Sequence, residues 1–368
     1  MTFADARSAY PVLERFAYLN AGTFGPVARA TADAVAERRL EDLERGRGGP
    51  AYFGWMLEAR ERVRGAFAGL LGGVDAGRVA LTRATTDGCN IVLTGLDLGP
   101  DDEIVTTDVE HFGLLGALAV SPARVRVAAV RDLPAEAAYE AVLAEVGPRT
   151  RLLALSHVAW TTGHVLPVAE LKRETGLPVL VDGAQSVGAI DVDASPFDFY
   201  TVSGQKWLCG PDSTGALYVA DPDGLRVTAP TYFSQARYEP DGSFEPKQGA
   251  ARFDNSWLAS GLLAGLEAAF GVHPEWAQAR AADMAARCRT LLAERVEVVT
   301  EPGHSTLVSF RVGGNPTEAV ARAYEQGVVV RDLPGTDLVR VSCGYWTSDE
   351  DLERLVRAFT GSEPVTKL

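Results

Sequence analysis

Short apolar runs alternate with helical stretches between residues 78 and 219, and this alternation restricts the possible folds more than any other feature of the chain. Such apolar runs are typical of strands that are covered on both faces. Parallel strands need long connections, which usually contain a helix. The pattern therefore predicts an α/β fold with a mostly parallel seven-stranded sheet and helices on both faces. The predicted strands are 78–82, 103–107, 125–130, 151–156, 178–182, 197–202 and 214–219.

The rest of the chain predicts a second, smaller domain. At 368 residues the chain can form two domains with separate cores. A long helical stretch at 258–294 is broken near His273, and short strands and helices alternate after it, which indicates an α+β domain. We therefore expect an N-terminal segment at 1–15, a large domain at 16–270 and a small domain at 271–368, with small-domain strands at 295–300, 307–312, 328–331 and 338–342.

Composition excludes several classes of function. The net charge of −14 argues against binding to a phosphate backbone, so we expect no nucleic-acid partner. The four cysteines lack metal-ligand spacing, and their small number is typical of reduced thiols in the cytoplasm. The first residues do not follow the order of a signal peptide, and no uncharged apolar run reaches membrane-spanning length. We expect a cytoplasmic protein that binds neither metal nor membrane.

A lysine and a carboxylate follow two of the predicted strands. Asp182 ends the strand 178–182, and Lys206 comes shortly after the strand 197–202. Ligands of such sheets bind beyond the carboxyl ends of the strands. A lysine there can form a Schiff base with an aromatic aldehyde, and a carboxylate can pair with a protonated ring nitrogen. The pair predicts pyridoxal 5'-phosphate (PLP) with Lys206 and Asp182 as catalytic residues. The alternative is a surface lysine after a buried strand and an aspartate in a turn.

Other polar residues near these strand ends suit the same cofactor. Thr85 and Thr86 begin a predicted helix, whose N–H groups suit the phosphate, although they also suit a plain helix cap. Ser203 adds a hydroxyl near that phosphate. His111 can stack on the ring and transfer protons, but an isolated histidine is often structural. Gln185 can donate to the phenolic oxygen of the ring or cap the next helix.

Arg340 is the candidate for substrate binding. It lies in the predicted strand 338–342, and a guanidinium there can bind an α-carboxylate through two hydrogen bonds. Arg331 competes for this role. The alternative is an arginine that forms a surface ion pair.

Together these residues resemble the class V aminotransferase and cysteine desulfurase superfamily, the fold-type-I PLP enzymes. The resemblance runs from about Tyr18 to Phe359 and is strongest in 181–185 and 203–211. It implies a small amino-acid substrate and a homodimer whose active sites lie at the subunit interface. The implied cofactor residues are Lys206, Asp182, His111, Gln185, Thr85, Thr86, Ser203, Gln205 and Asn255, the last reaching the cofactor phosphate of the neighbouring subunit, and the implied substrate residues are Arg340 and Asn20.

Three departures separate this chain from the desulfurases. Gln205 replaces the histidine that usually precedes the lysine, and Trp160 lies where desulfurases carry asparagine. The loop cysteine that forms a persulfide is missing, because Asp332-Leu-Pro-Gly follows Arg331 and Cys343 lies in a predicted strand. A buried strand thiol is a poor nucleophile. The sequence is therefore more similar to the branch of cysteine or cystine C–S lyases and isopenicillin N epimerase-like proteins.

This resemblance predicts cleavage of a carbon–sulfur bond by β-elimination, with Lys206 as the base that removes the α-proton. Epimerisation and transamination use the same residues and stay open as alternatives. A non-catalytic PLP-fold protein is a third, different class, against which the combination of Lys206, Asp182 and Arg340 argues.

Overall fold

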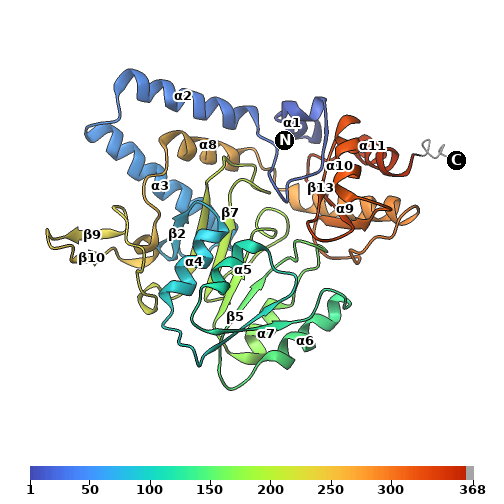
Figure 1. The fold of residues 1–368 in the computed structure, drawn as a ribbon. Helices are drawn as coiled ribbons and strands as arrows, with labels where there is room; N and C mark the ends of the chain where they lie inside the picture. The colour runs from blue at the N-terminus through green and yellow to red at the C-terminus, as the bar shows by residue number, and fades with distance from the viewer. Residues whose placement is uncertain (362–368) are drawn as a thin grey trace.

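A seven-stranded sheet forms the centre of the molecule in the computed structural model, which describes residues 1–361 (Figure 1). Its strand order is β2-β8-β7-β6-β5-β3-β4, and only β8 runs antiparallel to its neighbours. This confirms the predicted α/β fold with a mostly parallel sheet. Every strand end lies within two residues of its predicted position; the strands are β2 Val79–Thr82, β3 Glu103–Thr107, β4 Arg124–Ala128, β5 Thr150–Ser156, β6 Val179–Asp182, β7 Phe199–Ser203 and β8 Gly215–Val219.

Helices cover both faces of this sheet because successive strand residues point to opposite sides. In β5, Leu153 and Leu155 join one buried cluster, whereas Leu152 and Ala154 join another. The first cluster includes side chains of α3 (Pro50–Leu70), α6 (Ala138–Glu145) and α7 (Val168–Thr175), and the second includes side chains of α4 (Thr85–Gly95) and α5 (Phe112–Ala119).

A three-stranded antiparallel sheet forms the core of the small domain, in the order β11-β14-β13. The predicted strand at 295–300 is wrong, because this segment contributes only a single bridge, from Val298 to Phe310. Ser348 and Asp351 form the capping box at the start of the last helix. The elements are α9 (Ala277–Ala293), β11 (Leu307–Arg311), α10 (Pro316–Glu325), β12 (Val328–Val329), β13 (Arg331–Asp332), β14 (Leu338–Ser342) and α11 (Asp349–Thr360).

The N-terminal part of the chain links the two domains. Strand β1 (Ala17–Tyr18) pairs in parallel with β12, and Ala17 and Leu19 are buried in the small-domain core. The sequence division placed these residues in the large domain. The chain then passes through residues 20–25 to α2 (Arg29–Arg45), which packs against α8 (Ser260–Gly271). The division into 1–15, 16–270 and 271–368 stays a proposal, with its last boundary at the end of α8.

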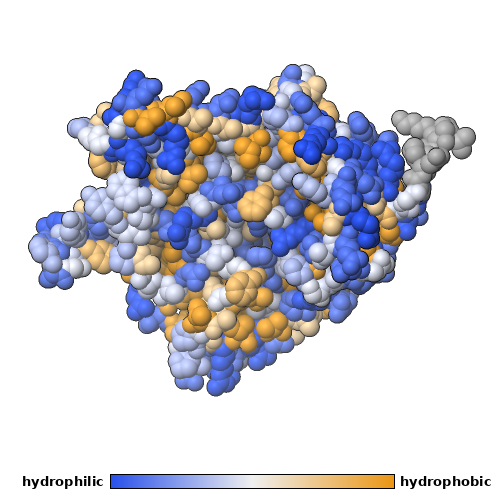
Figure 2. Space-filling model, turned by 45° about the horizontal axis from the view of Figure 1, so that its top comes forward, coloured by the Kyte–Doolittle hydropathy of each residue, from blue (hydrophilic) through white to orange (hydrophobic). Residues whose placement is uncertain are grey.

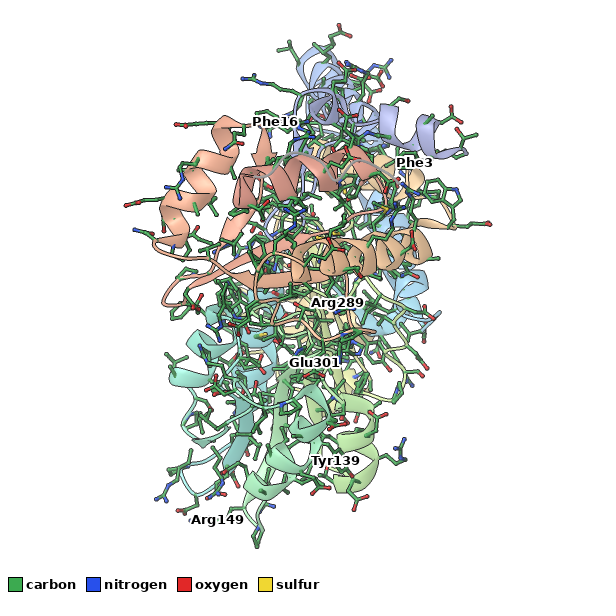
Figure 3. All side chains as sticks on the ribbon, turned by 90° about the vertical axis from the view of Figure 1, so that its right-hand side faces the viewer. Phe3, Phe16, Tyr139, Arg149, Arg289 and Glu301 are labelled. Carbon is green, nitrogen blue, oxygen red and sulfur yellow. The ribbon has the colours of Figure 1, made fainter. Side chains whose placement is uncertain are left out.

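The carboxyl ends of the parallel strands face the small domain. Arg149 forms an ion pair of 2.6 Å with Glu103 at the start of β3, and Figure 3 shows Arg149 at the far lower end of the molecule. Glu301 of the small domain lies well above it in the same view. The segment 221–248 carries a projecting hairpin of β9 (Gln235–Tyr238) and β10 (Phe244–Pro246) (Figure 1). Within residues 1–361, the helices are too short or too polar to cross a membrane.

Candidate active site

The structure brings Asp182 and Lys206 together at the ends of neighbouring strands. Asp182 is the last residue of β6 and is 3% exposed, and its Oδ1 accepts a hydrogen bond of 2.9 Å from the Ala184 N–H. Lys206 follows β7, and burial lowers its pKa to about 8 while the charge of Asp182 opposes that shift. Within residues 1–361 its Nζ has neither a hydrogen-bond nor an ion-pair partner. A largely buried amine without a partner, beside a carboxylate, is suited to bind an aldehyde.

Both the nitrogen and the oxygen of the Gln185 side-chain amide form hydrogen bonds within the protein. Its Nε2 donates to the Gly22 carbonyl at 2.8 Å, and its Oε1 accepts from the Trp207 indole at 3.0 Å. One amide hydrogen stays available for a ligand. Because Trp207 follows Lys206 directly, the amide is fixed relative to the lysine.

The helix α4 offers an anion site at its N-terminus. Its N-cap residue, Ala84, has no side chain that could accept from the first N–H groups. The hydroxyls of Thr85, Thr86 and Ser203 have no hydrogen-bond partner in the part of the chain that the structure describes. Free N–H groups and the helix dipole attract a phosphate there.

Asn255 lies beside the same helix in its own chain. Its Nδ2 donates to Oδ2 of Asp87, in the first turn of α4, at 2.6 Å. The neighbouring Asp254 is buried between Arg60 and Arg64 and fixes this loop against α3. The predicted contact of Asn255 with a neighbouring subunit stays a proposal.

His111 is the N-cap of α5 and borders the site. Its Nδ1 accepts from the Gly113 N–H at 3.1 Å, which leaves Nε2 as the ring nitrogen for other contacts. Its ring meets Trp160 edge to face, with centroids 5.1 Å apart. Burial and the positive charge of Lys206 lower the pKa of His111. The imidazole is therefore neutral near pH 7.

Sequence reasoning missed Glu110, which fixes the loop of His111. Its buried carboxyl accepts from the Thr107 hydroxyl at 2.6 Å and from the Ser156 N–H at 3.0 Å. It thereby joins the ends of β3 and β5, two neighbouring strands. Burial raises the pKa of Glu110 to about 7, and the charge of Asp182 adds to this shift. An acidic residue three positions after the end of an apolar strand was the available signal.

Two arginines and a hydroxyl form the other side of the site. Arg340 is 1% exposed and donates to the Trp160 carbonyl at 3.0 Å and to Thr23 Oγ1 at 3.3 Å. Arg331 lies directly opposite it on β13 and donates to the same hydroxyl at 3.1 Å. That hydroxyl in turn donates to Asn20 Oδ1 at 2.8 Å. Thr23 was not predicted, although it organises both arginines and Asn20.

Several buried polar atoms here have no partner within residues 1–361. They are Nε of Arg340, Nε1 of Trp160 and Oε1 of Gln205. An unsatisfied buried polar atom is costly and needs an explanation. Together with the free amine, the carboxylate and the uncapped helix, these atoms fit a phosphorylated aldehyde and an amino-acid substrate. Among the described residues no cluster of side chains could hold a metal ion.

None of the cysteines is placed to act as a nucleophile. All four are buried thiols without disulfides. Cys343 lies in the small-domain core, where a hydrogen bond with the neighbouring Cys288 and burial raise its pKa. Burial raises the pKa of Cys209, three residues after Lys206, to about 12. Thiols of this kind are rarely ionised near neutral pH.

The sequence profile of the family "Aminotransferase class-V" matches residues 47–355. The chain belongs to the class-V aminotransferase family. It is 31% identical over 388 residues to isopenicillin N epimerase of Streptomyces clavuligerus, covering 92% of this chain and 93% of that protein. It is 32% identical to a probable cysteine desulfurase of Pseudomonas aeruginosa, covering 83% of this chain and 82% of the relative.

The solved structures agree with this membership. The cystine C–S lyase C-DES, in complex with its product cysteine persulfide, is 29% identical with a TM-score of 0.88, covering 96% of this chain and 100% of that one. A variant of C-DES, with a TM-score of 0.89, holds glycine covalently linked to PLP. The class-V chain described here is therefore a PLP-dependent enzyme with the fold predicted from its sequence.

Proposed function

We propose that this enzyme cleaves a carbon–sulfur bond in a sulfur-containing amino acid that carries two carboxylates, such as cystine. The observation that carries this proposal is the arginine pair. Arg331 and Arg340 lie side by side on β13 and β14, share the Thr23 hydroxyl, and have no carboxylate partner within residues 1–361. Two unpaired guanidinium groups repel each other, and two anionic groups of one ligand would relieve that repulsion.

The site residues support a β-elimination. We propose that Lys206, Asp182, His111, Thr85, Thr86, Gln185, Gln205, Ser203 and Asn255 hold PLP, that Asn20 orients Thr23, and that Arg340 binds the α-carboxylate. PLP, when bound, supplies an electron sink for negative charge at the substrate Cα. With a pKa of about 8, the Lys206 amine is partly neutral at cellular pH and can accept the α-proton at Nζ.

The thiols support elimination over a desulfurase mechanism. A desulfurase needs a reactive cysteine, whereas the four thiols here are buried. Sulfur would instead leave as part of the product: cystine and water give cysteine persulfide, pyruvate and ammonia.

Epimerisation is the second candidate, favoured by the relative that covers 92% of this chain. It requires a proton donor on the second face of the substrate carbon. His111 is the residue to test for that role, since its Nε2 is not used by the α5 cap.

We also propose a cytoplasmic homodimer with shared active sites. Large apolar side chains are exposed at Phe112 (77%), Tyr232 (59%) and Trp257 (52%), and Tyr232 stacks on Trp257. Figure 2 shows several separate apolar patches on the face it presents. Patches of this kind are typical of subunit interfaces. The four free thiols support a reducing compartment.

A substrate panel tests the reaction. Purified enzyme with PLP receives L-cystine, L-cysteine or L-alanine, and pyruvate, ammonia, sulfide and stereochemistry are measured. We expect pyruvate from cystine with a kcat/KM at least about tenfold above that from cysteine, the ratio that about 1.4 kcal/mol of extra binding gives. Equal use of cysteine with release of sulfide, or inversion without pyruvate, would contradict the proposal.

A further inference from the structure

Tyr200 lies at the centre of a hydrogen-bonded chain behind Asp182. Its hydroxyl is 2.6 Å from Nδ1 of His157 and 2.6 Å from Oγ of Ser186. Tyr200 and Ser186 are completely buried. Tyr200 lies in β7, His157 directly follows β5 and Ser186 lies in the turn after β6, so these hydrogen bonds connect three adjacent strands.

This chain of hydrogen bonds is linked to the backbone of Asp182 and Gly183. Ser186 Oγ donates to the Gly183 carbonyl at 3.1 Å, and the backbone N–H of His157 donates to the Asp182 carbonyl at 3.0 Å. A Cβ on Gly183 would lie 2.3 Å from the Tyr200 ring, so the ring packs directly against this backbone. The Tyr200 ring therefore packs against the turn at Gly183, while its two hydrogen-bond partners, Ser186 and His157, bind the carbonyls of Gly183 and Asp182.

We propose that Tyr200 is a positioning residue for Asp182: its hydroxyl connects His157 and Ser186 and thereby fixes the carboxylate that faces the cofactor ring. This inference rests on the proposed role of Asp182 at the ring nitrogen. It assigns no contact between Tyr200 and cofactor or substrate.

We assign one order of proton donation to these hydrogen bonds, from His157 through Tyr200 and Ser186 to the Gly183 carbonyl. In the proposed arrangement the Ser186 proton goes to the Gly183 carbonyl, which can only accept, and the Ser186 oxygen accepts from the Tyr200 hydroxyl. The Tyr200 oxygen must then accept from His157, which places the histidine proton on Nδ1. Burial lowers the pKa of His157 to about 4 and raises that of Tyr200, so both groups stay neutral near pH 7.

A matched control lies on the next strand. Tyr218 of β8 is directly opposite Tyr200 in the sheet register and is 2% exposed. Its hydroxyl makes no hydrogen bond to the described residues 1–361. Tyr218→Phe therefore removes the same atom from the same sheet without touching the turn of Asp182.

The experiment compares Tyr200→Phe, Ser186→Ala and Tyr218→Phe as PLP-loaded enzymes. The first measurement is a pH titration of the visible absorbance of lysine-bound PLP, without substrate, so it does not depend on which reaction is catalysed. A loosened Asp182 holds the ring-nitrogen proton less well, and an unprotonated ring withdraws fewer electrons from the lysine linkage. The titration midpoint should rise by about half a unit or more in Tyr200→Phe and Ser186→Ala and stay within about 0.1 in Tyr218→Phe.

The second measurement is kinetic. Tyr200→Phe and Ser186→Ala should each lower kcat about tenfold and leave KM within about twofold, because the Asp182 carboxylate stabilises the transition state. An unchanged midpoint in Tyr200→Phe and Ser186→Ala, or an equal shift in Tyr218→Phe, would overturn the inference. Ser186→Ala keeps the Tyr200 ring in place and decides the question if Tyr200→Phe does not fold.

The third measurement needs no cofactor. In ¹⁵N-labelled apoprotein, Nδ1 of His157 should resonate as the protonated ring nitrogen and Nε2 as the unprotonated one, without titration between about pH 6 and 9. Ser186→Ala removes the acceptor that orients the Tyr200 hydroxyl, so the preference of the His157 proton for Nδ1 should weaken in that variant. A proton on Nε2 instead would overturn the chain, because Tyr200 would then donate to His157 and not to Ser186.

Discussion

The residues proposed for the cofactor ring and those of the substrate side differ in whether their polar atoms have hydrogen-bond partners within the protein. On the cofactor side Asp182, Gln185 and Glu110 each accept or donate hydrogen bonds within the protein. On the substrate side Arg340 Nε and Trp160 Nε1 are buried without a partner within residues 1–361, and two arginines face one hydroxyl. The carboxylate and the amide proposed for the cofactor ring are therefore preorganised, whereas the Lys206 amine, the phosphate-site hydroxyls and the substrate-side donors stay available for ligands.

Removing the lysine should break the cofactor side completely. Lys206→Ala should give no pyridoxyl peptide after borohydride reduction, because Nζ is the amine that forms the Schiff base. Turnover should fall by about three orders of magnitude or more, as expected when a residue that acts as both nucleophile and base is lost. In wild-type protein, peptide mass mapping should place the label on residue 206. A label on another lysine would move the cofactor site.

Removing the charge of the carboxylate should leave the cofactor bound. Asp182→Asn should cost at least about two orders of magnitude in kcat, the usual effect of removing one electrostatic stabiliser. PLP content, measured by absorbance after dialysis, should stay close to one per chain because the phosphate site is intact. Nearly normal kcat would show that another group contacts the ring nitrogen.

Substitutions of the two arginines should separate the two proposed carboxylate sites. Arg340→Ala should raise KM at least about 30-fold for cystine and for cysteine, because a buried charge loses its partner. Arg331→Ala should raise KM for cystine alone. Arg322→Ala is the control, since Arg322 is an exposed arginine of α10 paired with Glu318. Equal effects of Arg331→Ala on both substrates would remove the argument for a second carboxylate.

The uptake of PLP should depend on pH through Lys206. Only the neutral amine attacks an aldehyde, and the Lys206 pKa of about 8 lies below that of a free lysine. The rate of reconstitution of PLP-free protein, followed by stopped-flow absorbance, should rise from pH 6.5 and level off above a midpoint near 8. The shift comes mainly from burial, so it should persist when salt is added. A midpoint near 10 would show that the amine is exposed in the apoprotein.

The smallest effect on activity is expected for a residue outside the active site. Cys343→Ser should keep activity within about twofold, because the thiol is buried in the small-domain core and reaches no ligand. Loss of sulfur release with α-proton exchange intact would identify a desulfurase and refute the elimination mechanism.

The sheet and the cofactor side could be predicted because their signals are local. Apolar runs mark the strands; Asp182 ends one of them, and Lys206 follows another by three residues. The substrate side depends on contacts without a local pattern: Arg331 reaches Thr23 across 308 positions, and Arg340 reaches it across 317. The residues 295–300 have strand-like composition, but on the free edge of β11 they form only one bridge, from Val298 to Phe310.

The segment from β1 to Gly25 links the assembly of the site to synthesis of the chain. Its Gly22 N–H donates to the Ser342 hydroxyl at 3.1 Å, and the Tyr18 carbonyl accepts from the Trp346 indole at 3.0 Å. On the ribosome these first residues emerge long before their partners. The sheet can form early, whereas the wall of the substrate site must wait until β12 and β14 have been synthesised. A nascent chain stalled before β14 would therefore have the lysine in place but no competent active site.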